Sequence, residues 1–190
     1  MTLDPGRDDY FGTSIPGCPD LAESDFLTTR PFYRLTVAAG AGGTVSALGR
    51  ACRQGESCSF VVRGGTEVTL VASPARRHRL AGWSSSCGRA TTCRVTVGSN
   101  TSVAATFNRL YRLKLSAAGP GLVRLSPGGK TCRGGRTCVF DVVARTPLSL
   151  RAVPGRGARF VRWRGGACAG KPTCVVRLSA DAALMATFAR

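Results

Sequence analysis

Residues 78–97 read HRLAGWSSSCGRATTCRVTV, and residues 158–178 read ARFVRWRGGACAGKPTCVVRL. Both stretches contain a tryptophan, a short step rich in glycine or serine, two cysteines separated by five residues, and a β-type run. The same pattern written twice in one chain indicates an internal duplication.

The duplication extends beyond these two stretches. The matched residues are Tyr33/Tyr111, Cys52/Cys132, Cys58/Cys138, Pro74/Pro154, Trp83/Trp163, Cys87/Cys168, Cys93/Cys174 and Phe107/Phe188. Because almost no linker separates the copies, we expect them to be stacked or closely tethered. The sequence predicts a short, irregular acidic N-terminal segment (residues 1–32), extended or loosely ordered, followed by module 1 (residues 33–108) and module 2 (residues 109–190).

Eight of the nine cysteines share the spacing Cys-x5-Cys, in the pairs Cys52/Cys58, Cys87/Cys93, Cys132/Cys138 and Cys168/Cys174. In a strand the two Cα atoms of such a pair would lie about 20 Å apart, and in a helix about 9 Å. A disulfide needs roughly 4.4–6.8 Å, so the chain must reverse between the cysteines. Each intervening segment contains glycine, which suits a turn. We predict a disulfide across the neck of a five-residue hairpin loop in each case.

Two alternatives to these disulfides remain. Structural zinc sites favour two to four residues between paired cysteines and often recruit histidine, whereas the gap here is five and the only histidine is His78. Reduced thiols are the other alternative. Disulfides would imply an oxidising compartment, which predicts an extracellular or cell-surface protein. Cys18 is left over, and it could pair with another chain or with a segment missing from this sequence.

The apolar residues between the cysteines alternate with period two, as in Tyr33, Leu35 and Val37. This period, with turn residues every 8–12 positions, is typical of strands. We therefore predict an all-β (or β-rich, β-grasp-like) fold of two small disulfide-stapled modules. Core anchors are expected at Trp83, Trp163, Phe107 and Phe188. Ligand stacking is the less favoured role for the tryptophans.

The order of motifs resembles the divergent InlB B-repeat, also called the bacterial repeat domain. The motifs that carry the resemblance are GAGGTV or GPGLVRLSP, the first cysteine pair, GTEVTLVASPA, an apolar-Gly-Trp step, the second pair, and VGSNTSVAATF or LSADAALMATF. The resemblance covers both copies, about 155 of the 190 residues. Module 2 departs from the family pattern at Arg162, which precedes Trp163 where the family often has glycine. Module 1 keeps this glycine as Gly82, before Trp83. The resemblance implies a β-grasp-like spacer or adhesive module on secreted or surface-displayed bacterial proteins, with no common catalytic residue.

The sequence offers no arrangement for catalysis, metal binding or a cofactor. A Ser/His/Asp or Cys/His arrangement is not plausible, because the chain has one histidine and its paired cysteines are expected to be oxidised. The two modules contain only four acids, and no pair of them recurs between the copies. We therefore predict a protein without enzymatic activity, metal or cofactor.

Charge is the main functional signal. The chain carries 27 lysines and arginines against 10 acids, a net charge of +17, and six of the acids lie in residues 1–32. Arginines recur at matched positions before and around the two tryptophans: Arg76, Arg77 and Arg79, and Arg156, Arg159, Arg162 and Arg164. Such clusters attract polyanions. The alternative interpretation is a solvated loop in a protein rich in arginine through coding bias.

These features predict a non-catalytic extracellular or cell-surface spacer or adhesion module, whose basic face binds anionic polysaccharides of the envelope or of a host. The alternative function is binding of nucleic acid without sequence preference, which the scarcity of aromatic residues for base stacking disfavours. No apolar run reaches the roughly 18 residues of a membrane span. The first residues do not read as a signal peptide, which suggests a fragment or a misplaced start.

Overall fold

The computed structural model describes residues 30–166, 168 and 170–190. Most of these residues lie in strands, and none lies in a helix. The predicted all-β fold is therefore confirmed. The structure predicted for residues 1–29, and Cys18 with it, lies outside the described residues.

Module 1 is built from eight strands in two sheets. Sheet A has the order β4-β1-β8-β6, and sheet B has the order β3-β2-β5-β7. The strands are β1 (Phe32–Ala39), β2 (Gly43–Ala47), β3 (Arg50–Cys52), β4 (Ser57–Arg63), β5 (Thr66–Pro74), β6 (His78–Trp83), β7 (Thr92–Val97) and the first half of β8 (Thr101–Ala118).

Module 2 repeats this plan strand for strand. Sheet C has the order β11-β8-β15-β13, and sheet D has the order β10-β9-β12-β14. The strands are the second half of β8, β9 (Gly121–Ser126), β10 (Thr131–Arg133), β11 (Thr137–Val143), β12 (Pro147–Pro154), β13 (Arg159–Arg164), β14 (Thr173–Arg177) and β15 (Ala182–Ala189).

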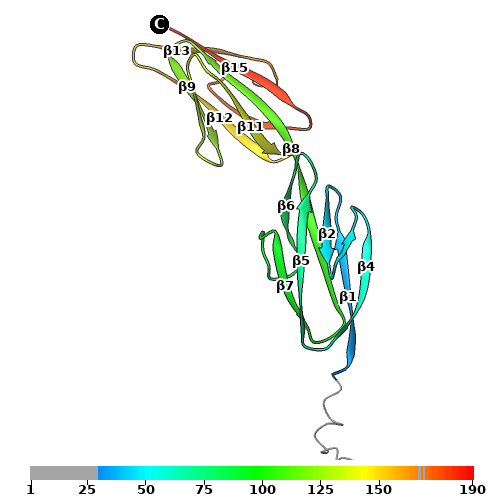
Figure 1. The fold of residues 1–190 in the computed structure, drawn as a ribbon. Helices are drawn as coiled ribbons and strands as arrows, with labels where there is room; N and C mark the ends of the chain where they lie inside the picture. The colour runs from blue at the N-terminus through cyan, green and yellow to red at the C-terminus, as the bar shows by residue number, and fades with distance from the viewer. Residues whose placement is uncertain (1–29, 167, 169) are drawn as a thin grey trace, which may run out of the picture.

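One strand, β8, belongs to both modules. Its first half pairs in parallel with β1, and its second half pairs in parallel with β15. It is therefore the last strand of module 1 and the first strand of module 2, and the predicted boundary at residues 108/109 falls inside it. Figure 1 shows the result, two elongated modules end to end with β8 running from one into the other.

Each pair of sheets encloses its own hydrophobic core. In module 1, Leu35 and Val103 of sheet A pack with Leu70 of sheet B, and all three are at most 1 % exposed. Module 2 has a separate cluster built on the equivalent residues of sheets C and D. Inward residues alternate with outward ones along the strands, as expected for two sheets packed face to face.

All four predicted disulfides form, with Cα–Cα distances of 5.4–5.9 Å. The predicted hairpin neck is wrong for the first pair of each module. Cys52 lies on β3 of sheet B and Cys58 on β4 of sheet A, and Cys132 and Cys138 lie on β10 of sheet D and β11 of sheet C. These strands do not pair with each other. The chain does reverse between the cysteines, but it crosses from one sheet to the other as it does so.

The predicted hairpin neck is also wrong for the second pair of each module. Cys93 lies on β7 of sheet B and Cys174 on β14 of sheet D, whereas Cys87 and Cys168 precede these strands, in the segments that lead from β6 and β13. Because β6 and β13 belong to sheets A and C, these segments cross between the layers. Each of the four disulfides therefore closes a crossover and not a hairpin.

The disulfides are buried to different depths in the two modules. Cys138 and Cys174, on the edge strands β11 and β14, are only partly buried and pack against the module 2 core from its border. Their counterparts Cys58 and Cys93 are buried within the module 1 core. In the second disulfide of each module the other cysteine shows the reverse order, since Cys87 is partly buried and Cys168 is buried, so only the first disulfide is clearly more exposed in module 2. A cysteine spacing predicts the bond but gives no information on how far the facing sheet covers an edge strand.

The two tryptophans lie in the cores and hold the second crossover of each module. Trp83 and Trp163 are 8 % and 7 % exposed. The Trp83 Nε1–H donates to the Ala90 carbonyl at 2.8 Å, and the Trp163 Nε1–H donates to the Lys171 carbonyl at 3.0 Å. Both carbonyls lie inside the Cys-x5-Cys loop, so each indole connects the core to a disulfide loop.

Two phenylalanine rings explain why glycine is needed at one position in each of the motifs GAGGTV and GPGLV. Phe188 is buried, and its partly buried counterpart Phe107 packs against the module 1 core. A Cβ atom on Gly121 would meet the Phe188 ring at 2.7 Å, and one on Gly43 would overlap the Phe107 ring. Glycine at these two positions lets β9 and β2 approach the rings.

Candidate functional site

The first predicted arginine cluster lies at the joint between the modules. Arg77 sits in the β5–β6 turn with a positive φ of 59°. Its carbonyl accepts the N–H of Leu110 at 2.7 Å, and its Nη2 donates to Asp181 Oδ2 at 2.9 Å. Asp181 belongs to the β14–β15 loop of module 2, so Arg77 of module 1 contacts module 2 through both its backbone and its side chain.

Asp181 connects three parts of the joint. Its Oδ1 accepts the backbone N–H of Arg112 on β8 at 3.0 Å. This hydrogen bond, together with the Arg77 guanidinium, lowers the pKa of Asp181 below its ordinary value. In module 1 the equivalent residue is Asn100, whose Oδ1 accepts the N–H of Arg34 at 2.8 Å. The backbone contact is therefore shared by both modules, and the ion pair exists only at the joint.

Backbone hydrogen bonds reach across the joint from the other side as well. The N–H of Ala144, in the β11–β12 turn of module 2, donates to the carbonyl of Arg109 at 2.9 Å. Arg109 is itself paired with His78 on β6 of module 1. Residues 109 and 110 of β8 are thus held by turns from both modules.

The predicted arginines do not gather in one place. Arg76 and Arg79 are exposed beside the joint. Arg156 lies in the equivalent β12–β13 turn of module 2, and Arg159 begins β13, where it pairs with Ala189 at the far end of the molecule. The remaining two, Arg162 and Arg164, are exposed on β13. That these residues bind a polyanion stays a prediction.

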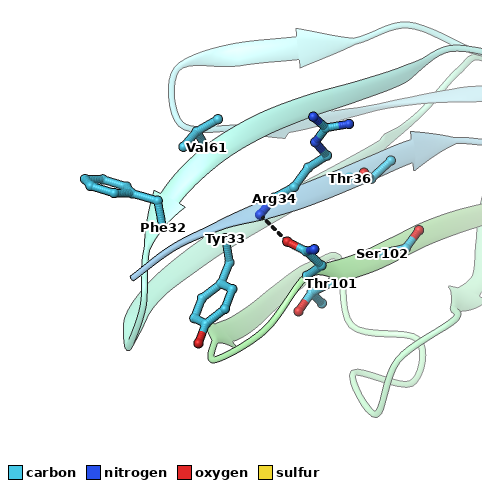
Figure 2. A pocket seen from close by; sticks show the side chains of 8 residues that line it. Phe32, Tyr33, Arg34, Thr36, Val61, Thr101 and Ser102 are labelled. Atoms are coloured by element: carbon cyan, nitrogen blue, oxygen red, sulfur yellow. Dashed lines mark hydrogen bonds between the residues drawn. The ribbon is translucent and has the colours of Figure 1, made fainter. Parts of the chain in front are cut away.

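An open groove of about 480 Å³ crosses the outer face of sheet A at the end where β1 begins. Figure 2 shows Phe32 and Val61 at its outer end and Arg34, Thr36 and Ser102 further along the strands. Phe32 and Val61 are 63 % and 73 % exposed. The groove contains one cation and no carboxylate or histidine, so its lining provides no acid–base pair.

The carboxylates of the described residues form structural contacts or lie apart from one another. Glu67 pairs with Arg94 at 3.4 Å, and Glu56 accepts the N–H of Arg53 within the first Cys-x5-Cys loop at 3.1 Å. Across the described part of the chain, no three histidine, cysteine or carboxylate residues gather as a metal site. His78 lies beside the Arg76 carbonyl, with 3.0 Å between that oxygen and Nδ1.

Two arginines that the sheets bring together were not predicted from the sequence. Arg124 on β9 and Arg151 on β12 lie directly opposite each other on the outer face of sheet D, and both are exposed. Each stands between two buried residues of a strand, as in Val123-Arg124-Leu125. This alternation identifies them as outward-facing, but only the register places them opposite each other.

Within the described ranges, no helix has the length and apolar character to cross a membrane.

A comparison with protein families matches residues 33–110 to the divergent InlB B-repeat domain. No curated protein matches the chain significantly. The matched region ends at the joint, since it spans module 1 and the first half of β8. Module 2 has the same strand order, the same two disulfides and the same buried tryptophan. Residues 33–110 are therefore similar to a divergent InlB B-repeat domain, and module 2 repeats the same plan outside the matched region.

Proposed function

We propose that this protein is a non-catalytic, stiff spacer or adhesion element outside the cell or on its surface, with a basic surface that contacts anionic polysaccharides. The observation that carries the spacer role is the joint. An 18-residue strand passes through both modules, and at about 3.3 Å per residue it spans about 60 Å. Turns from both modules hold its central residues.

The disulfides support the proposed compartment. Four disulfides within two small modules are typical of proteins that fold in an oxidising environment. Small modules also depend on such crosslinks because their cores are small. A bacterial repeat unit with this chemistry fits a secreted or surface-displayed protein.

The net charge supports the binding role. Among residues 30–190 only four acids offset the arginines and lysines, so the modules attract anionic polymers at long range. Binding of nucleic acid has less support, since Phe32 is the one large aromatic residue exposed among those described and base stacking needs such residues.

Pulsed electron paramagnetic resonance tests the stiff joint. Spin labels are placed by non-canonical amino acids at the exposed residues Thr96 and Thr137, which leaves the cysteines paired. We expect one narrow distance distribution. A control variant with a Gly-Ser insertion between Arg109 and Leu110 should give a broad distribution. Equally broad distributions in both proteins would contradict the spacer role.

A further inference from the structure

The outer face of sheet D carries a row of polar side chains that spans all four strands. The register places Thr131, Arg124, Arg151 and Thr173 side by side on β10, β9, β12 and β14. All four residues are exposed. The two arginines occupy the central strands, where the Cβ atoms of directly opposed residues lie about 4.5–5.5 Å apart.

No described acid neutralises this row. The two acids of module 2 are Asp141 on β11 and Asp181 in the β14–β15 loop, and neither lies on a strand of sheet D. Within residues 30–166, 168 and 170–190, neither Arg124 nor Arg151 forms an ion pair. Two further exposed arginines, Arg133 and Arg177, lie on the edge strands of the same sheet. The face therefore carries four exposed arginines, with the exposed Val175 between Thr173 and Arg177 on β14.

Module 1 lacks this row, although its backbone is equivalent. The residues that correspond to Thr131, Arg124, Arg151 and Thr173 are Ala51, Ser46, Val71 and Thr92, and the register aligns them in the same way. On this face of module 1, Arg94 is paired with Glu67. The opposed arginines are thus specific to module 2 and are not a requirement of the fold.

Opposed like charges on neighbouring strands destabilise a sheet, so an anion between them would relieve a cost that the free protein carries. Two planar guanidinium groups flanked by two hydroxyl groups suit a tetrahedral oxyanion, which accepts several hydrogen bonds at once. The face has no aromatic side chain on which a base could stack.

We propose that the Thr131–Arg124–Arg151–Thr173 row binds the sulfate or phosphate ester groups of an anionic polysaccharide. The row would be the contact point of the basic surface, and this inference rests on the polysaccharide-binding part of the proposed function.

The test compares two double variants of the full chain that lose the same charge. R124S/R151V introduces the residues that module 1 holds at these positions, so the sheet should tolerate it. R156S/R159S removes two arginines of the cluster predicted from the sequence, Arg156 in the β12–β13 turn and Arg159 at the start of β13. The pair of variants therefore weighs the row against that predicted cluster. Binding to dextran sulfate, dextran phosphate and unmodified dextran is measured by isothermal titration calorimetry at several salt concentrations, with double-stranded DNA as a further ligand.

We expect the wild type to bind both charged dextrans but not unmodified dextran. R124S/R151V should weaken this binding about tenfold, because it removes two charge-assisted contacts. R156S/R159S should change it by less than about threefold. The reverse change in module 1, S46R/V71R, should add a second site and raise the stoichiometry.

Three outcomes would overturn the inference, and they differ in what else they affect. If the wild type binds neither charged dextran, the binding part of the proposed function falls with it. Should both double variants weaken binding equally, general charge attraction explains the binding and the row is not a site, while the proposed function stands. If DNA binds more tightly than either dextran and R124S/R151V abolishes that binding, the ligand is nucleic acid.

Discussion

Modules 1 and 2 have the same strand order, the same two disulfides and the same tryptophan contact, yet their outer surfaces differ. Sheet B presents Ser46 and Val71 where sheet D presents opposed arginines. Asn100 makes one backbone contact where Asp181 also binds an arginine of the other module. The difference shows that inward positions keep the fold, whereas outward positions are free to acquire separate roles.

Replacement of the tryptophans should give the largest changes in the free energy of unfolding, and these changes should differ between the modules. In module 2 the ring of Phe160 lies 5.8 Å from that of Trp163 and 6.1 Å from that of Phe188, whereas Leu80 is the equivalent residue in module 1. W83A should lower the free energy of unfolding by about 3–5 kcal/mol. W163A should cost about 0.5–1.5 kcal/mol more, because aromatic contacts are lost as well. Urea denaturation would measure both, and an equal loss would show that the aromatic cluster adds nothing.

Removal of the first disulfide should lower the free energy of unfolding by the same amount in the two modules. Each of these disulfides closes a loop with the same sequence separation of six. C52A/C58A and C132A/C138A should therefore each lower the free energy of unfolding by about 2.4 kcal/mol according to the loop-entropy account. Denaturation under non-reducing conditions would measure both losses, with intact mass as the control for the remaining disulfides. Losses that differ more than twofold would mean that packing dominates, since Cys58 is buried and Cys138 only partly so.

The fold could be predicted because its signals are local. Period-two alternation gives strands, and the chain reversal between paired cysteines gives disulfides. The hairpin interpretation was wrong because a cysteine spacing fixes only that the chain reverses. Whether Cys52 and Cys58 end on one sheet or on two depends on where β3 and β4 pair, and that is set by contacts distant in the sequence.

The site could be predicted only in part. The sequence shows that arginines such as Arg77 and Arg156 lie in equivalent turns, but it does not reveal that one turn lies at the joint and the other at the free end. Arg124 and Arg151 are 27 positions apart, and only the register of β9 with β12 places them together. Asp181 gives no sequence signal beyond replacing Asn100.

The arginine row should also affect the free energy of unfolding, with opposite signs for its removal from module 2 and its introduction into module 1. R124S/R151V should raise the free energy of unfolding by about 0.2–1 kcal/mol, because opposed like charges are removed. S46R/V71R should lower it by a similar amount. Thermal denaturation at low and high salt would measure both effects, and both should shrink as salt screens the charges. A loss of stability in R124S/R151V would mean that the arginine stems pack usefully on the sheet.

The joint should give the smallest effect on stability and the clearest effect on geometry. D181N copies Asn100, so it should keep the hydrogen bond from Arg112 and lose only the ion pair with Arg77. Because Asp181 and Arg77 are both exposed to solvent, overall stability should hardly change. The distance distribution between labels at Thr96 and Thr137 should broaden, less than with the Gly-Ser insertion.

Acid should reproduce this effect in the wild type. Since the pKa of Asp181 is lowered in the folded protein, the charged form favours the joint. Its contribution is complete above the ordinary pKa of 3.8 and disappears as the pH falls through the lower folded value. The wild-type distribution should therefore stay narrow from neutral pH down to about pH 4 and broaden below it. The ion-pair part of this change should be absent in D181N. If the distance distributions of D181N and wild type broaden alike as the pH falls, the Arg77–Asp181 ion pair does not contribute to the stiffness of the joint. In that case β8 and the backbone hydrogen bonds of Leu110 and Ala144 hold the modules in line by themselves.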